Sequence, residues 1–141
     1  MKILIPLDGS ANAQRAFDYV INNITMWKEA PQLLLLNVQT NVASGNVKLF
    51  INQETINDHY REQGEAALES ARKVLDAADL PYQFHISIGP SAVAIAQYAD
   101  EQSVNQIVMG RQGQSGLQTR LLGTVVNKVL QLAECPVLLV K

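Results

Sequence analysis

Residues 104–130 read VNQIVMGRQGQSGLQTRLLGTVVNKVL and contain a predicted strand, a glycine-rich loop and the start of a predicted helix. The strand is the apolar run Val104 to Met109, and the helical pattern begins at the pair Gly123 and Thr124. When a helix joins two strands of one sheet, it carries the chain back to the edge where the first strand began, so the strands are parallel. The stretch therefore predicts one unit of an α/β fold.

The glycine-rich loop has the features of a phosphate site. Gly110 and Gly113 lack Cβ atoms, so the backbone can take a positive φ and its N–H groups can approach an anion closely. Gly123 and Thr124 start a helix whose first N–H groups have no partner within the helix, and the Thr124 hydroxyl adds a donor. The alternative is structural: the glycines only turn a loop and Thr124 only caps the helix. Spacing alone does not separate the two.

The same alternation of strands and helices extends over the whole chain. Ser10 is a candidate N-cap for the first helix. The predicted strands are Lys2 to Leu7, Gln32 to Val38, Tyr82 to Ile88, Val104 to Met109 and Pro136 to Val140. The four helical stripes, spaced at the period of an α-helix, are Phe17, Val20, Ile21 and Ile24; Leu68, Ala71, Leu75 and Ala78; Ala92, Ile95, Ala96 and Ala99; and Val126, Val129, Leu130 and Ala133.

The composition of the strands predicts their order in an open, five-stranded parallel sheet with helices on both faces. Continuous apolar runs at residues 3–5 and 33–36 suit central strands, whereas residues 82–88 alternate between apolar and polar, as expected near an edge. The order 3-2-1-4-5 satisfies both observations. Winding then reverses between the first and fourth strands, and ligands bind at the carboxyl ends of strands that flank such a reversal. The loops there are Asp8-Gly9-Ser10 and residues 110–123.

Length and charge narrow the class of protein. A chain of 141 residues with 48% apolar residues predicts one compact domain. The net charge of −2 lacks the basic footprint of a nucleic-acid binder. No signal peptide is expected at the amino terminus, and no apolar run approaches the length needed to cross a membrane. The single cysteine, Cys135, excludes an intrachain disulfide, fits a cytoplasmic location, and is expected to be an unreactive core thiol.

The last predicted strand raises the question of assembly. Residues 137–140 (VLLV) would form an edge strand that is apolar on both faces and has unpaired hydrogen-bonding groups. Pairing with the same strand of a second subunit about a two-fold axis would cover it. We therefore expect a homodimer, and the competing explanation is a helix or loop folded over that edge.

Three segments, MKILIPLDGS, GRQGQSGLQTRLLGT and CPVLLVK, resemble the universal stress protein family, and the similarity covers residues 1–141. The nucleotide-binding branch of that family carries the pattern G-x2-G-x9-G-[S/T]. Gly110, Gly113, Gly123 and Thr124 occupy its fixed positions. The resemblance implies a single Rossmann-like domain similar to the adenine nucleotide α-hydrolases. It also implies ATP as ligand, with ADP, AMP and bound Mg²⁺ as open alternatives, and dimers formed through the last strand.

The resemblance also assigns residues to parts of the ligand. Two residues depart from the family's usual pattern: Asn37 stands where a histidine often precedes the valine, and Asn105 stands where an aspartate often opens the fourth strand. By position, Pro6, Asp8, Val38 and Met109 would border the adenine, while Gly110, Gly113, Gly123, Thr124 and Val125 would contact the ribose and phosphates.

Several charged residues near this loop have open roles. No lysine follows the second glycine, as it would in a P-loop enzyme, so positive charge would come from Arg111 or Arg120. Both also suit a solvated loop, and Arg111 is the better candidate for a contact with phosphate. Lys128 is expected on a solvated helix face. Asp8 suits Mg²⁺ binding through the phosphates or a structural turn, and we favour a contact with the base or a backbone role.

No catalytic relay is visible in the sequence. His59 and His85 have no suitably spaced nucleophile or carboxylate and are interpreted as structural, so any ATP hydrolysis should be slow. Residues 40–52 would form a lid over the site or a plain surface loop. Three hypotheses follow: a cytoplasmic, dimeric, ATP-binding regulatory protein; a slow ATPase or phosphotransfer enzyme; and a nucleotide-free interaction module.

Overall fold

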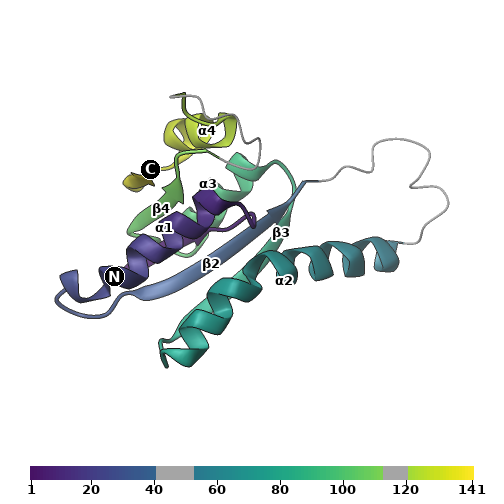
Figure 1. Cartoon of the computed structure of the whole chain (residues 1–141). Coiled ribbons are helices and arrows are strands. Elements are labelled where there is room, and N and C mark those ends of the chain that lie inside the picture. The colour runs from purple at the N-terminus through teal and green to yellow at the C-terminus, as the bar shows by residue number, and fades with distance from the viewer. Residues whose placement is uncertain (41–52, 113–120) are drawn as a thin grey trace.

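The computed structural model describes residues 1–40, 53–112 and 121–141. The chain is drawn in Figure 1. Its strands form one parallel sheet in the order β3-β2-β1-β4-β5, which confirms the predicted topology. The elements are β1 (Lys2–Pro6), α1 (Ala11–Asn22), a short 3₁₀ helix η1 (Ile24–Met26), β2 (Gln32–Gln39), α2 (Gln53–Ala77), β3 (Tyr82–Ile88), α3 (Ser91–Glu101), β4 (Gln106–Gly110), α4 (Thr124–Leu132) and β5 (Val137–Val140).

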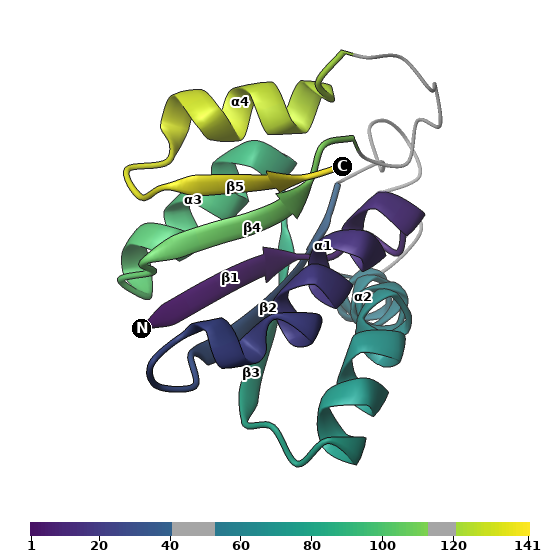
Figure 2. The same ribbon diagram turned by 60° about the vertical axis from the view of Figure 1, so that its left-hand side comes forward.

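Helices cover both faces of the sheet, and strand alternation divides the core into two parts. Successive strand residues point to opposite faces. Ile3 and Ile5 therefore belong to the core beneath α1 and α2, together with Leu68 of α2. Leu4 belongs to the other core, with Val126 of α4. Figure 2 shows α1 and α2 on one side of the sheet and α3 and α4 on the other.

Most residues of the predicted helical stripes are buried or partly buried, as expected. Ser10 caps α1 as predicted, because its Oγ accepts a hydrogen bond from the Ala13 N–H at 3.1 Å. All four residues of the α3 stripe are buried. The predicted burial was wrong for two residues: Ala78, just past the end of α2, is exposed, and Leu130 is 43% exposed. Ile24 and Ala133 pack against the core but lie just outside α1 and α4. Because α4 packs beside α3 over the β4–β5 end of the sheet, only its narrow face at Val126 and Val129 is buried.

Asn105, one of the two departures from the family pattern, lies at the amino end of the sheet, just before β4. Its Oδ1 accepts a hydrogen bond from the Lys2 backbone N–H at 2.7 Å, and its own N–H donates to the Lys2 carbonyl at 3.0 Å. Both contacts join the start of β1 to the start of β4. Ligands of a parallel sheet bind at the carboxyl ends of the strands, which is the opposite end of the sheet. Asn105 therefore has no part in the predicted site.

The two edge strands differ in how they are covered. On β3, Phe84 is 40% exposed and the Arg72 guanidinium of α2 lies 4.2 Å from the centre of its ring. On β5, all four residues are half-buried: Leu138 packs against one core and Leu139 against the other. The apolar nature of both faces of β5 is therefore confirmed, and within the described residues no strand pairs with its outer side.

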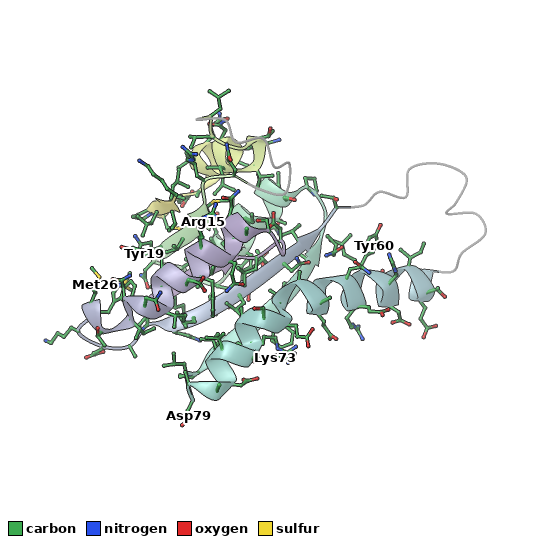
Figure 3. The ribbon with its side chains drawn as sticks, in the orientation of Figure 1. Arg15, Tyr19, Met26, Tyr60, Lys73 and Asp79 are labelled. Atoms are coloured by element: carbon green, nitrogen blue, oxygen red, sulfur yellow. The ribbon has the colours of Figure 1, made fainter. Side chains whose placement is uncertain are left out.

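The long helix α2 extends past the sheet at its amino-terminal end, where Tyr60 is nevertheless buried (Figure 3). On its outer surface the Lys73 Nζ pairs with Glu69 Oε1 at 2.6 Å, and both side chains are exposed. An exposed pair of this kind contributes little to stability. None of the helices within residues 1–40, 53–112 and 121–141 combines the length and the apolar character needed to cross a membrane.

Candidate functional site

A cavity of about 90 Å³ lies at the carboxyl ends of β1 and β4, where the winding of the sheet reverses. Its walls are mainly apolar and come from three strands, β1, β2 and β4, with the residues that follow β1 and β4, and from three helices, α1, α3 and α4. They consist of Pro6, Leu7, Asp8, Ala13, Leu36, Val38, Ser91, Ile95, Met109, Gly110, Gln112, Val125 and Val126. Pro6, Asp8, Val38, Met109, Gly110 and Val125 are residues that the sequence predicted for the site.

The loop after β1 is shaped by a turn at Asp8. The Asp8 carboxylate accepts a hydrogen bond from the Ser10 N–H at 2.9 Å. Gly9 has a φ of +81°, in the left-handed region that favours glycine. Asp8 therefore fills the turn role considered from the sequence and also lines the cavity. The same turn brings the Ser10 cap and the first turn of α1 to the edge of the site.

Gly110 lines the cavity for a reason different from the predicted one. The positive-φ glycines in the described part of the chain are Gly9 and Gly89, so Gly110 does not need glycine for its φ. What it needs is space: a Cβ at Gly110 would lie 2.5 Å from the backbone oxygen of Asn12 and 2.6 Å from its carbonyl carbon. Glycine therefore allows the first turn of α1 to pack directly against the end of β4.

The amino terminus of α4 opens beside the cavity. Gly123 is the N-cap, as the Gly-Thr pair predicted, with φ −62° and ψ 154°. A glycine cap offers no side-chain acceptor, so the first-turn N–H groups are not capped in this way. The Gly123 N–H itself donates to the Arg111 carbonyl at 3.1 Å. Thr124 is exposed at the first helical position, while Val125 and Val126 reach the cavity.

Gln112, which the sequence analysis missed, lines the cavity, whereas Arg111 does not. Arg111 continues the pairing of β4 with β5, because its N–H donates to the Val140 carbonyl at 3.0 Å. The Gln112 Nε2 donates to the Leu121 carbonyl at 2.9 Å, which joins the two described ends of this loop. The signal that could have found Gln112 is its place in the chain, because it lies two residues past the carboxyl end of β4.

The start of α3 was also missed. Ser91 and Ile95, one helical turn apart on α3, line the cavity next to α4. The helix that follows β3 must begin at the carboxyl edge of the sheet, where every parallel strand ends. The predicted strand order therefore contained this information, although the Ile95 stripe suggested only a core role.

Asn37, the second departure from the family pattern, lies beside the site in a buried position. It is 2% exposed and is the buried polar side chain of the described core. Its Nδ2 donates to the Leu7 carbonyl at 2.8 Å, and its Oδ1 accepts from the Gln39 Nε2 at 2.7 Å. The side chain thus connects the end of β2 to the loop that follows β1.

Other candidates lie elsewhere or outside the described residues. Gly113, Arg120 and residues 41–52 lie outside them. Lys128 is exposed on α4, as expected. Burial raises the pKa of the Cys135 thiol, which agrees with an unreactive cysteine because less thiolate forms near neutral pH.

The histidines lie away from the cavity walls. His59 and His85 are both exposed, and the His85 ring stacks on Tyr98 at 5.1 Å between centres. In the described ranges, no group of three or more histidine, cysteine, aspartate or glutamate side chains is placed to hold a metal ion. A second hollow lies along the outer face of α2, lined by Glu62, Glu65, Ala66, Glu69, Arg72, Lys73 and Asp76. It is a charged helix surface, without the apolar walls of the first cavity.

A parallel sheet in this order, with an apolar cavity at the reversal, defines an α/β protein of the Rossmann-like class. The universal stress protein family model matches residues 1–141. The chain belongs to the universal stress protein family.

Individual relatives agree with this assignment. The chain is 31% identical to universal stress protein MJ0531 of Methanocaldococcus jannaschii, over 99% of this chain and 81% of the relative. It is 30% identical to universal stress protein YxiE of Bacillus subtilis, over 99% of this chain and 98% of the relative. The solved structure of MJ0577, also from M. jannaschii, is similar with a TM-score of 0.84 and 28% identity, covering 99% of this chain and 94% of that chain.

Two more distant structures share the fold and contain nucleotides. A family member from Arabidopsis thaliana with AMP bound has a TM-score of 0.69 and 20% identity, covering 100% of this chain and 91% of that chain. The Archaeoglobus fulgidus protein in complex with dAMP has a TM-score of 0.66 and 19% identity, covering 100% of this chain and 98% of that chain.

Proposed function

We propose that this universal stress protein is a cytoplasmic, ATP-binding regulatory protein whose nucleotide occupies the cavity between β1 and β4. The observation that carries the proposal is that six residues predicted to contact the nucleotide line this one cavity. The AMP and dAMP complexes of the distant family members support an adenine nucleotide as the class of ligand. The G-x2-G-x9-G-[S/T] pattern supports ATP in particular, and the single cysteine supports a reducing compartment.

The described residues divide into two functional parts. Pro6, Val38 and Met109 offer apolar surfaces suited to a planar base. The amino terminus of α4, which Gly123 does not cap with a side chain, offers N–H groups and the positive end of the helix dipole, which suit phosphate oxygens. Gln112 adds a polar side chain between these parts. ATP would add negative charge that Mg²⁺ can neutralise, and the proposal includes no catalytic step.

Nucleotide binding can be measured directly. Denaturing freshly purified protein should release ATP, ADP or AMP at close to one per subunit, identified by chromatography with mass detection. For nucleotide-free protein, Mg-ATP at about 100 times its Kd stabilises the native state by about 2.7 kcal/mol and should raise Tm by roughly 9 °C. Absence of both effects would favour the nucleotide-free interaction module. Hydrolysis of added ATP well above the rate of a heat-denatured control would favour the enzyme hypothesis instead.

We further propose that the protein is a homodimer paired through β5. The Val140 carbonyl faces β4, where it accepts from the Arg111 N–H. Since alternate strand residues direct their N–H and C=O groups to opposite sides, those of Leu139 face outward. Pairing two such edges would bury the apolar side chains and satisfy the free backbone groups.

A pair of variants at Leu139 tests this interface. Leu139→Pro removes an outward N–H without removing a bond to β4, so it should convert a dimer of 15.5 kDa chains to monomers in light-scattering chromatography. Leu139→Ala keeps the N–H and should remain dimeric. A dimer that survives Leu139→Pro would place the interface on another surface, and a wild-type monomer would exclude the homodimer.

A further inference from the structure

The orientation of the Asn37 amide follows from its partners. The Leu7 carbonyl can only accept a hydrogen bond, so the NH₂ group of Asn37 must face it, at 2.8 Å. The amide oxygen then faces the Gln39 Nε2, at 2.7 Å, which holds the amide in this orientation. Both polar ends of a side chain that is 2% exposed are therefore satisfied, and they are satisfied in one orientation only.

The hydrogen bonds of Leu36 and Gln39 show which neighbouring strand the backbone groups of Val38 face. The Leu36 carbonyl faces β1, because it accepts from the Leu7 N–H at 2.8 Å. The Gln39 carbonyl faces β3, because it accepts from the Gly89 N–H at 2.9 Å. Backbone groups alternate between the two sides along a strand, so those of Val38 face the β1 side, like those of Leu36.

The side-chain NH₂ of Asn37 replaces the Val38 backbone N–H as the donor to the Leu7 carbonyl. In a continued parallel ladder, the Leu7 carbonyl would accept from the Val38 N–H, two residues beyond Leu36. In the described structure its hydrogen bond comes from the Asn37 side chain instead. The backbone ladder between β1 and β2 therefore ends at the Leu7 N–H. Val38 lines the cavity. Its N–H and C=O groups face the β1 side, beyond the last hydrogen bond of the β1–β2 ladder.

We propose that Asn37 is a positioning residue: by capping the Leu7 carbonyl, it keeps the N–H and C=O of Val38 available to the edge of a bound heterocycle. The class of ligand that matches is a planar ring with an acceptor nitrogen next to an amino donor, as in adenine. In this proposal Asn37 does not contact the ligand, and the Gln39 side chain holds the Asn37 amide in place by donating to its Oδ1. The inference rests on the proposed function, because it explains how that same cavity would recognise a base.

Three variants separate positioning from simple structural support. Asn37→Ala removes the cap, so the Val38 N–H is expected to close onto the Leu7 carbonyl. Asn37→His can restore the cap, because a neutral imidazole has one donor and one acceptor. Asn105→Ala is the matched control: it also removes an asparagine that joins β1 to a neighbouring strand, but at the opposite edge of the sheet.

Two readouts are needed, and the first requires no ligand. Amide hydrogen exchange by NMR should find the Val38 N–H fast in the wild type, slower by at least tenfold in Asn37→Ala, and unchanged in Asn105→Ala. The second readout is the Kd for AMP and ATP by calorimetry. It should rise tenfold or more in Asn37→Ala, return to within about threefold in Asn37→His, and stay at the wild-type value in Asn105→Ala.

The outcomes distinguish this inference from the proposed function. If wild-type protein binds AMP and ATP and Asn37→Ala binds them equally well, the positioning role is wrong and the proposed function stands. If the wild type binds neither nucleotide, the proposed function and the inference both fail. If Asn37→Ala does not fold, two measurements still decide. A Val38 N–H that is protected from exchange in the ligand-free wild type would overturn the proposal. Fast exchange of that N–H in the wild type, together with loss of affinity in a folded Asn37→Asp variant, would support it.

Discussion

Replacing Gly110 with alanine is expected to lower the free energy of unfolding by about 1–3 kcal/mol, as overpacking of a filled interior commonly does. The added Cβ would meet the Asn12 backbone, with its oxygen only 2.5 Å away. A backbone segment in the first turn of α1 cannot rotate aside as a side chain can, so α1 must move away from β4. Because Ala13 and Gly110 both line the cavity, nucleotide affinity should fall as well. Urea unfolding and calorimetry on the same variant measure both effects.

Gly64 provides the matched comparison for this substitution. A Cβ at Gly64 would come within 2.6 Å of the Ile86 side chain, so the crowding is similar in distance but involves side-chain atoms and not the backbone. Gly64 also lies inside α2, where alanine is favoured over glycine by about 1 kcal/mol. Gly64→Ala should therefore cost less stability than Gly110→Ala and should leave nucleotide affinity unchanged. Equal stability losses for the two variants would show that the backbone contact at Asn12 relaxes easily.

Replacing Val125 with glutamate is expected to weaken ATP binding by roughly tenfold or more while the protein stays folded. Val125 is 38% exposed and lines the cavity in the first turn of α4. A carboxylate there is favourable for the helix dipole, so folding should tolerate it. The same carboxylate would repel the nucleotide phosphates by about 1–4 kcal/mol at about 4 Å, depending on how much water intervenes. Each 1.4 kcal/mol corresponds to about a tenfold change in Kd.

Two further variants isolate the charge from the change in shape. Val125→Gln has nearly the same shape as the glutamate without its charge, so it should retain most of the affinity. Val93→Glu adds the same charge at a residue that is 41% exposed on α3 and does not line the cavity, and it should bind as the wild type does. The loss in Val125→Glu should shrink at high salt. Wild-type affinity in a folded Val125→Glu variant would show that the phosphates do not bind at the amino terminus of α4.

Much of the fold could be predicted because its signals are local. A run such as residues 33–36 is apolar throughout because a central parallel strand is buried on both faces. Ser10 could be recognised as a cap because its partner, the Ala13 N–H, is three residues away. The strand order followed from the burial expected of each strand, whereas Pro6, Val38 and Met109 were assigned to the site by the resemblance to the family; all three line the cavity.

The parts of the site that the sequence missed depend on contacts between distant segments. Ser91 and Ile95 reach the cavity because α3 starts at the same edge as α4, and Gln112 lines it from the segment just past the end of β4. Arg111 carries a charge that suits phosphate, yet it does not line the cavity, and its backbone N–H pairs with the Val140 carbonyl of β5.

The sequence by itself determined the alternation of strands and helices, the order of the sheet, the start of α4 and the edge at which the cavity lies. Each of these follows from residue periodicity and turn chemistry within a few positions of the chain. Only the tertiary structure decided that Gly110 makes room for the Asn12 backbone and that Asn37 ends the β1–β2 ladder at Leu7. These roles arise where segments 98 and 30 residues apart meet, and no local pattern specifies the atoms that will be in contact there.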